Sequence, residues 1–138
     1  MQSEILIDAG PLIALFDRTD AYHAGIICFL KNKQYRFVST VAVLTEVSHM
    51  LDFNVNAQLD FFEWVGINGV ILHEIAQNDI PRIIALTKKY ADLPMDFADA
   101  TLVVAAEHTG IRQIISIDAD FDIYRLPGKL KIKNVFEK

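Results

Sequence analysis

The chain has 138 residues, of which 52% are hydrophobic and 22% charged, a composition typical of one compact domain with a sizeable core. The formal net charge of −5 argues against a protein that coats nucleic acid through charge alone, although an acidic pocket neutralised by metal ions stays open. With one cysteine, no signal-like start and no apolar run near the ~20 residues that span a bilayer, we expect a soluble cytoplasmic protein without a membrane role.

Short apolar runs alternate with longer helical patterns along the chain. We expect strands at 5–7, 35–39, 70–75, 113–117 and 132–136. We expect helices at 11–16, 21–30, 41–51, 57–65, 79–90 and 95–108. The predicted N-caps are Asp20, Thr40 and Asn78, and Gly110 should end the last helix. Lysines alternate with apolar residues at 129–133, which is typical of an edge strand.

Strands that alternate with helices predict an α/β domain whose parallel sheet is covered on both faces. In open sheets of this kind, functional sites lie beyond the carboxyl ends of the strands. Two acids fall at such ends, because Asp8 follows the run 5–7 and Asp118 follows the run 114–117.

Two further acids stand out by their helical positions. At about 100° per residue, Asp99 falls in the middle of an apolar stripe on its helix. A lone carboxylate buried there must be protonated, paired with a cation or bound to metal. Glu46 lies at the edge of the stripe formed by positions 43, 44, 47, 50 and 51. Phe97 and Val104 lie opposite Asp99, which indicates deep burial of this helix or a protein partner.

The four acids offer only oxygen ligands, which suit Mg²⁺ or Mn²⁺ better than zinc. The four histidines lack the close spacing of a transition-metal site, and Cys28 is expected in the core. Hydrated ions of this kind polarise a phosphate oxygen and activate a water molecule. The pattern therefore favours phosphoryl chemistry.

Four segments resemble, in order, the acid-bearing motifs of the PIN-domain family, and in particular of the VapC toxins of toxin–antitoxin pairs. They are 5–17, 38–47, 95–106 and 115–121. The third contains the family's Met-Asp-x-Ala-Asp-Ala variant, and the fourth has a serine two residues before its acid. The resemblance implies a single PIN-like domain over 1–138, with a three-layer α/β/α architecture around a five-stranded parallel sheet. It also implies Mg²⁺-dependent cleavage of RNA by a metal-activated water, with Mn²⁺ as a substitute.

Carried over by position, the resemblance assigns catalytic roles to Asp8, Glu46, Asp99 and Asp118. It assigns metal binding to Asp8, Asp99 and Asp118, with Asp96 as an added member. The expected partners are an RNA substrate, an antitoxin protein and a second copy of the chain.

Three neighbouring residues could support the site, and two of them have a second interpretation. Asp96 could bind the metal or cap its helix. Ser116 could orient Asp8 by a hydrogen bond, in a supporting role. Asp120 matches the spacing of an extra family acid, but it could equally cap a turn.

Other functional classes remain as alternatives. The chain could be an RNA-processing nuclease without a toxin role, or an adaptor that keeps the fold without activity, although an inactive domain has no need to bury four acids. A phosphoryl-handling domain such as a receiver or phosphatase would carry a phosphorylated aspartate after a strand. A receiver would carry a lysine at the position of Asp118, and a phosphatase would carry an acid at the position of Gly10.

Overall fold

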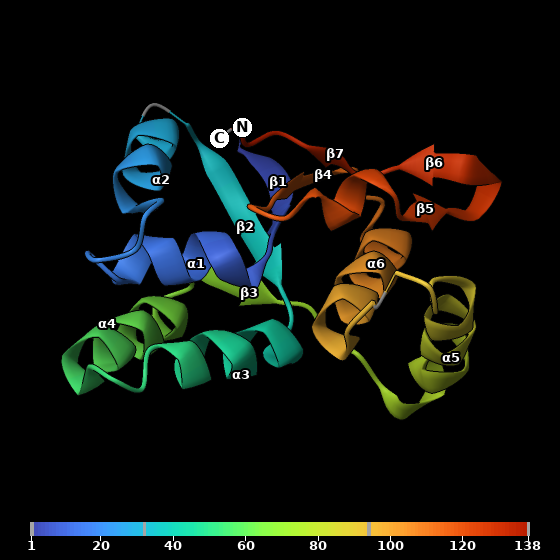
Figure 1. Ribbon diagram of the computed structural model, residues 1–138, viewed down its shortest axis with the longest axis horizontal. Coiled ribbons are helices and arrows are strands. Elements are labelled where there is room, and N and C mark those ends of the chain that lie inside the picture. The colour runs from blue at the N-terminus through green and yellow to red at the C-terminus, as the bar shows by residue number, and fades with distance from the viewer. Residues whose placement is uncertain (1, 32, 94, 138) are drawn as a thin grey trace.

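The computed structural model describes residues 2–31, 33–93 and 95–137. Its centre is a five-stranded sheet in the order β3-β2-β1-β4-β7, and all of its strand pairs are parallel. Helices α1, α2 and α4 lie on one side of the sheet and α5 and α6 on the other, with α3 near the carboxyl ends of the strands (Figure 1). The expected three-layer α/β/α fold is therefore confirmed.

The main-sheet strands are β1 Ser3–Ile7, β2 Tyr35–Ser39, β3 Val70–Leu72, β4 Gln113–Ile115 and β7 Lys133–Asn134. The helices are α1 Ala9–Phe16, α2 His23–Leu30, α3 Val41–Met50, α4 Val55–Gly66, α5 Ile80–Lys89 and α6 Phe97–Thr109. Three short 3₁₀ turns are η1 Gln77–Asp79, η2 Ala119–Asp122 and η3 Pro127–Lys129. Strands β5 Arg125–Leu126 and β6 Leu130–Lys131 form a separate antiparallel pair.

Three strands, β3, β4 and β7, are shorter than the sequence predicts. For β3 and β4, the pairing register gives the reason. Leu72 pairs with Ser39, the last residue of β2, and the His73 amide makes a final bond to the Ser39 carbonyl at 2.8 Å, so β3 ends there. Ile115 pairs with Ile7, the last residue of β1, so β4 ends there and not at Asp118. Strands end where their neighbours turn into helices, and hydropathy alone cannot show this.

Several predicted helix ends are confirmed and two are wrong. Thr40 caps α3, and Gly110 ends α6 in the left-handed conformation at φ +80°. Asp20 instead accepts a hydrogen bond from the Tyr22 amide at 2.8 Å and forms a turn before α2. Asn78 lies inside η1, where the neighbouring Asp79 accepts from the Ala76 amide at 2.8 Å.

The core is built around β1 and α6. Ile5, Leu6 and Ile7 are fully buried, and α6 is buried from Ala98 to Ala106, in accord with its two apolar sides. Phe97, at the start of α6, is 55% exposed.

Two expectations about single segments need correction or qualification. Cys28 is exposed and not in the core, because α2 buries only Ile26. The lysine-rich segment 129–133 is divided, with β6 in the antiparallel pair and β7 at the edge of the main sheet. Within the described ranges, no helix is long and apolar enough to cross a membrane.

Candidate active site

Asp8 sits where β1 turns into α1 and is 5% exposed. Its carboxylate caps α1, accepting from the Ala9 amide at 2.8 Å, and its second oxygen accepts from the Ser116 hydroxyl at 3.1 Å. The predicted bond from Ser116 is therefore present. Burial raises the pKa of Asp8 from 3.8 to about 7, against the lowering effect of both hydrogen bonds and with a small contribution from the Asp118 charge.

Asp99 lies in the first turn of α6 and is 7% exposed, as its place in the apolar stripe predicts. The fully buried Tyr124 donates its hydroxyl to one Asp99 oxygen at 2.9 Å. Burial, together with the nearby charge of Asp8, raises the pKa of Asp99 from 3.8 to about 8. The pKa of Tyr124 is raised as well, through burial and its contact with Asp99.

The structure confirms one of the two interpretations of Asp96, the helix cap, and places its side chain in the acidic pocket. It caps α6, because its carboxylate accepts from the Asp99 amide at 2.8 Å. It also lines the same cavity as Asp8 and Asp99, and its charge raises the pKa values of Asp99 and Glu46. Capping therefore does not remove this carboxylate from the site.

Glu46 and Asp118 complete the pocket from its more open side, and both are exposed. Burial, followed by the charges of Asp96 and Asp118, raises the pKa of Glu46. The cavity measures about 160 Å³ and brings together residues from four separate segments: Asp8, Ala9, Gly10, Ile13, Glu46, Met50, Asp96, Asp99 and Asp118. The four acids predicted from the sequence thus share one pocket.

Asp120 does not line this cavity. Its backbone carbonyl accepts from the amides of Ile123 and Tyr124, which stabilises the turn at η2. Its charge still raises the pKa of Asp99, so it contributes to the electrostatics of the pocket from outside.

Two residues that sequence reasoning missed hold the predicted ones in place. Tyr124 bonds Asp99, and a buried tyrosine that needs a partner for its hydroxyl was the available signal. Asn134 on β7 accepts from the Ser116 amide at 3.2 Å and donates to the Ser116 carbonyl at 2.9 Å. This bracing fixes the serine that orients Asp8, and nothing local in the sequence marks it.

The chemistry of the donor set fits a divalent cation, although the carboxylates as they lie do not form a closed coordination shell. In the described part of the chain, no group of three or more His, Cys, Asp or Glu side chains is arranged to hold a metal ion. The pocket nonetheless gathers five carboxylates, and in those same ranges none of them forms an ion pair with Lys or Arg. Uncompensated charge on hard oxygen ligands is what Mg²⁺ or Mn²⁺ would neutralise.

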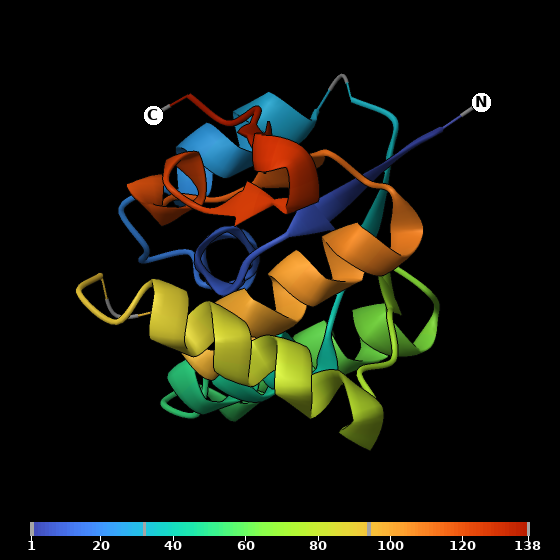
Figure 2. The same cartoon turned by 90° about the vertical axis from the view of Figure 1, so that its right-hand side faces the viewer.

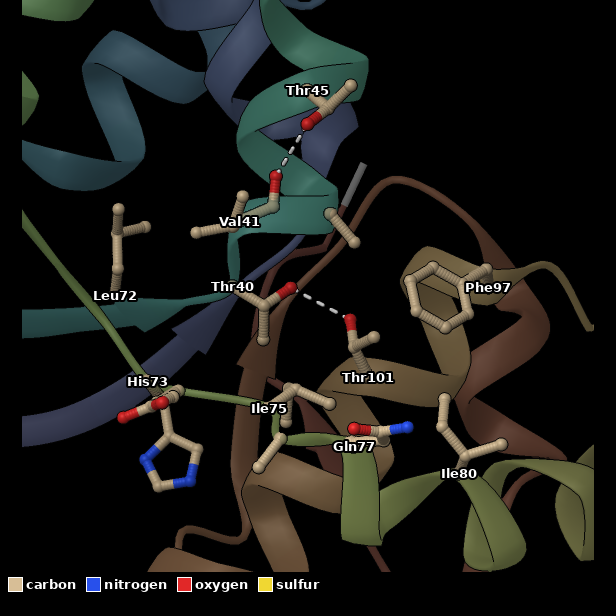
Figure 3. Close-up of a pocket in the computed structure, with 13 residues that line it drawn as sticks. Thr40, Val41, Thr45, Leu72, His73, Ile75, Gln77, Ile80, Phe97 and Thr101 are labelled. Carbon is tan, nitrogen blue, oxygen red and sulfur yellow. Dashed lines mark hydrogen bonds between the residues drawn. The ribbon is translucent and has the colours of Figure 1, made fainter.

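A larger apolar groove of about 590 Å³ lies next to the acidic pocket, since Thr45 and Phe97 in its lining are the chain neighbours of Glu46 and Asp96. Figure 3 shows the side chains that line this groove. The starts of α3, α5 and α6 and the segment after β3 line it, with Val41, Ile75, Ile80 and Phe97 among the side chains that face it. The hydroxyls of Thr40 and Thr101 meet at 2.8 Å in its floor. Helices α3 and α6 thus contribute both to this groove and to the acidic pocket.

Comparison with known proteins supports the fold. Neither the protein-family models nor the curated proteins yielded a match to this sequence. Among solved structures, VapC20 of Mycobacterium tuberculosis, described as a toxin that cleaves the sarcin–ricin loop, matches with a TM-score of 0.77. The match covers 86% of this chain and 93% of that chain at 18% sequence identity. The chain has a PIN-like fold. In this PIN-like fold, the carboxyl ends of β1 and β4 meet the second half of α3 and the start of α6, which is where the four acids converge.

Proposed function

We propose that this chain is a metal-dependent endoribonuclease that hydrolyses RNA phosphodiester bonds with water. The observation that carries the proposal is the cluster of Asp8 and Asp99, two buried carboxylates that form no ion pair with a basic residue in the part of the chain that the structure describes. Their raised pKa values mark a pocket that disfavours bare negative charge, as expected of a site completed by a cation. The similarity to a toxin that cleaves the sarcin–ricin loop favours RNA as the substrate.

Under this proposal, each carboxylate has a distinct part. Asp8 and Asp99, fixed by Ser116 and Tyr124, would form the rigid part of the metal site. Asp118 and Asp96 would complete the ligand set, since the exposed Asp118 can move toward an ion at little cost. When bound, Mg²⁺ would polarise the phosphate and lower the pKa of the attacking water.

Glu46 would act from α3, across the pocket from the α6 acids. Its exposed carboxylate has a raised pKa, so it is a stronger base than an ordinary glutamate. We assign it the positioning of the attacking water and the acceptance of its proton.

A toxin role within a toxin–antitoxin pair is the biological setting that we propose. An antitoxin would supply basic side chains to the acidic pocket, whose carboxylates form no ion pair with Lys or Arg within residues 2–31, 33–93 and 95–137. The rival setting is an RNA-processing nuclease without an antitoxin. Co-purification of the chain with the product of its neighbouring gene would favour the first, and a catalytically active chain with no such partner would favour the second.

We also propose that a second copy of the chain covers the apolar groove beside the pocket. The homodimer is the assembly that the PIN-domain resemblance implies, and the groove is rimmed by Val41 and Phe97, which are 59% and 55% exposed. A dimer formed there would place the two acidic pockets beside the interface, because α3 and α6 belong to both surfaces.

The test is cleavage of a mixed RNA pool by purified protein in Mg²⁺, in Mn²⁺ and in EDTA. Wild-type protein should cut in either metal and not in EDTA, while Asp99→Asn should be inactive under all three conditions. Equal cleavage by wild type and Asp99→Asn would contradict the assignment, since it would trace the activity to a contaminant or another site.

A further inference from the structure

A second charged surface, distinct from the acidic pocket, lies between α5 and the β5–β6 hairpin. It is a hollow of about 630 Å³, hereafter the basic hollow, lined by Arg82, Lys89, Arg125, Leu126, Pro127, Gly128 and Lys129. Both flanking elements face the viewer in Figure 2. Of the seven described residues that line it, four are basic and none is acidic, in a chain whose net charge is −5.

The cations of the basic hollow are only partly neutralised by the protein. Arg82 forms a bidentate pair with Glu107 at 2.8 to 3.1 Å, so its charge is compensated. Among the described residues, the Arg125 side chain donates to the backbone carbonyls of Asp122 and Tyr124, which carry no charge. Lys89 and Lys129 are exposed, and no carboxylate in the described ranges lies within ion-pair distance of them.

Two features of the hairpin around these cations are unfavourable in free energy. Arg125 and Lys131 are direct partners across β5 and β6, an arrangement in which like charges repel. Lys129 has a φ of +61° directly after Gly128 at +75°, a left-handed conformation that lysine adopts only at a cost in free energy. A bound anion would relieve the repulsion.

The basic hollow shares a wall with the acidic pocket. Tyr124, whose hydroxyl reaches Asp99, directly precedes Arg125 in the chain. The Arg125 amide donates to the Tyr90 hydroxyl at 2.8 Å, Tyr90 follows Lys89, and the two tyrosine rings lie 5.0 Å apart. One pair of tyrosines therefore separates the basic surface from the acids.

We propose that the basic hollow binds backbone phosphates of the RNA strand on one side of the bond that is cleaved, through Lys89, Arg125 and Lys129. This inference rests on the proposed function. The acidic pocket repels the polyanion that it must cut, so affinity has to come from cations nearby. Contacts of this kind position the strand without reading its sequence. An acidic peptide would also match the positive charge of the basic hollow. We favour RNA because the hollow and the acidic pocket lie on either side of the Tyr90–Tyr124 pair, so a strand that enters the pocket would pass the hollow.

The test compares RNA binding by variants made in the Asp99→Asn background, which prevents cleavage. The double variant Lys89→Glu/Lys129→Glu disrupts the basic hollow. The matched control Lys31→Glu/Lys33→Glu makes the same change in net charge at the end of α2, on the other side of the sheet. Fluorescence anisotropy with a labelled single-stranded RNA of about 20 nucleotides, titrated between about 50 and 200 mM NaCl, measures the affinity and its salt dependence.

The hollow variant should bind this RNA about tenfold more weakly or worse, and the control should match the parent. The salt slope should fall by about 0.7 for each phosphate that the variant no longer neutralises, so by about 1.4 for two phosphates. Lys129→Gly should also weaken binding while melting no lower than the parent, because glycine relieves the left-handed strain. Equal weakening in the hollow variant and the control would overturn the proposal, as would poly-glutamate that displaces the RNA equally well per charge.

Cleavage kinetics separate this inference from the proposed function. In the active background, the hollow variant should raise KM for a long RNA, with a smaller effect on kcat. If wild type is active and the hollow variant has an unchanged KM, RNA binding by the basic hollow is refuted and the proposed ribonuclease activity is not. A wild type that binds RNA through the hollow without cutting it would refute the nuclease alone.

Discussion

Replacing the Asp99 carboxylate by an amide should stabilise the metal-free protein at alkaline pH. Asp99 is 7% exposed, and its pKa is raised from 3.8 to about 8, mainly by burial and then by the charge of Asp8. The folded state therefore retains a proton that the unfolded chain releases between these two values. The stability that this proton contributes is fully present below the pKa of Asp99 in the unfolded chain. It is lost as the pH rises through the pKa of Asp99 in the folded protein.

The size of the effect follows from the shift. One pKa unit corresponds to about 1.4 kcal/mol. Between about pH 5 and about pH 8.5, the stability difference between the two proteins can therefore change by at most about 4 kcal/mol. Solvent at the open side of the pocket screens part of this, which leaves about 2 to 4 kcal/mol. An asparagine at this position carries no charge, and its amide oxygen can still accept the Tyr124 hydroxyl.

Urea unfolding in EDTA at the two pH values measures this difference. The stability of Asp99→Asn relative to wild type should rise by about 2 to 4 kcal/mol from about pH 5 to about pH 8.5. The exposed Asp60 on α4 provides a matched control, and Asp60→Asn should show no such rise. A constant or shrinking difference between Asp99→Asn and wild type would refute the claim that this carboxyl is held buried at an energetic cost.

Three further outcomes follow from the same geometry. Mg²⁺ at about 100 times its dissociation constant should stabilise wild type by about 2.7 kcal/mol in thermal or urea melts, and should leave Asp99→Asn unchanged; equal stabilisation of both would place the ion elsewhere. Tyr124→Phe should lower stability by about 1 to 3 kcal/mol and raise the pKa of Asp99 further, because the hydroxyl that stabilises the carboxylate is lost. The acidic limb of the cleavage pH profile should then move to higher pH, and a limb at the same pH as in wild type would count against the contact. Phe97→Glu should shift the chain toward monomer in light scattering, with the exposed Ile67→Glu on the far side as control; an unaltered mass would exclude the groove as the dimer interface.

Much of the fold could be predicted because the sequence encodes it locally. Apolar runs give β1 and β2, and the acids at 8 and 118 mark the edge of the sheet where its strands end. The improbable place of Asp99 in an apolar stripe also identifies a buried carboxylate from the sequence alone. These features depend on a few residues close together in the sequence, so the periodicity of its hydrophobic residues is enough to predict them.

What could not be predicted depends on contacts between distant segments. The ends of β3 and β4 are set by Ser39 and Ile7 in neighbouring strands. Tyr124 supports Asp99 from 25 positions away, and Asn134 braces Ser116 across the β4–β7 pair. Lysines and arginines that look scattered along the chain become one basic hollow only when α5 packs beside the β5–β6 hairpin. No local pattern contains that information.

The central claim is that the acidic pocket directs water to a phosphodiester bond of RNA. Single-turnover cleavage in ¹⁸O-labelled water, followed by mass analysis of the new ends, tests it most directly. Water attack forms one bond from phosphorus to solvent oxygen and breaks one bond to a ribose oxygen, so wild type with Mg²⁺ should yield a linear terminal phosphate that carries one ¹⁸O. Asp8→Asn and Asp99→Asn should yield none. A 2′,3′-cyclic phosphate without label would contradict the account, because the ribose hydroxyl would then be the nucleophile.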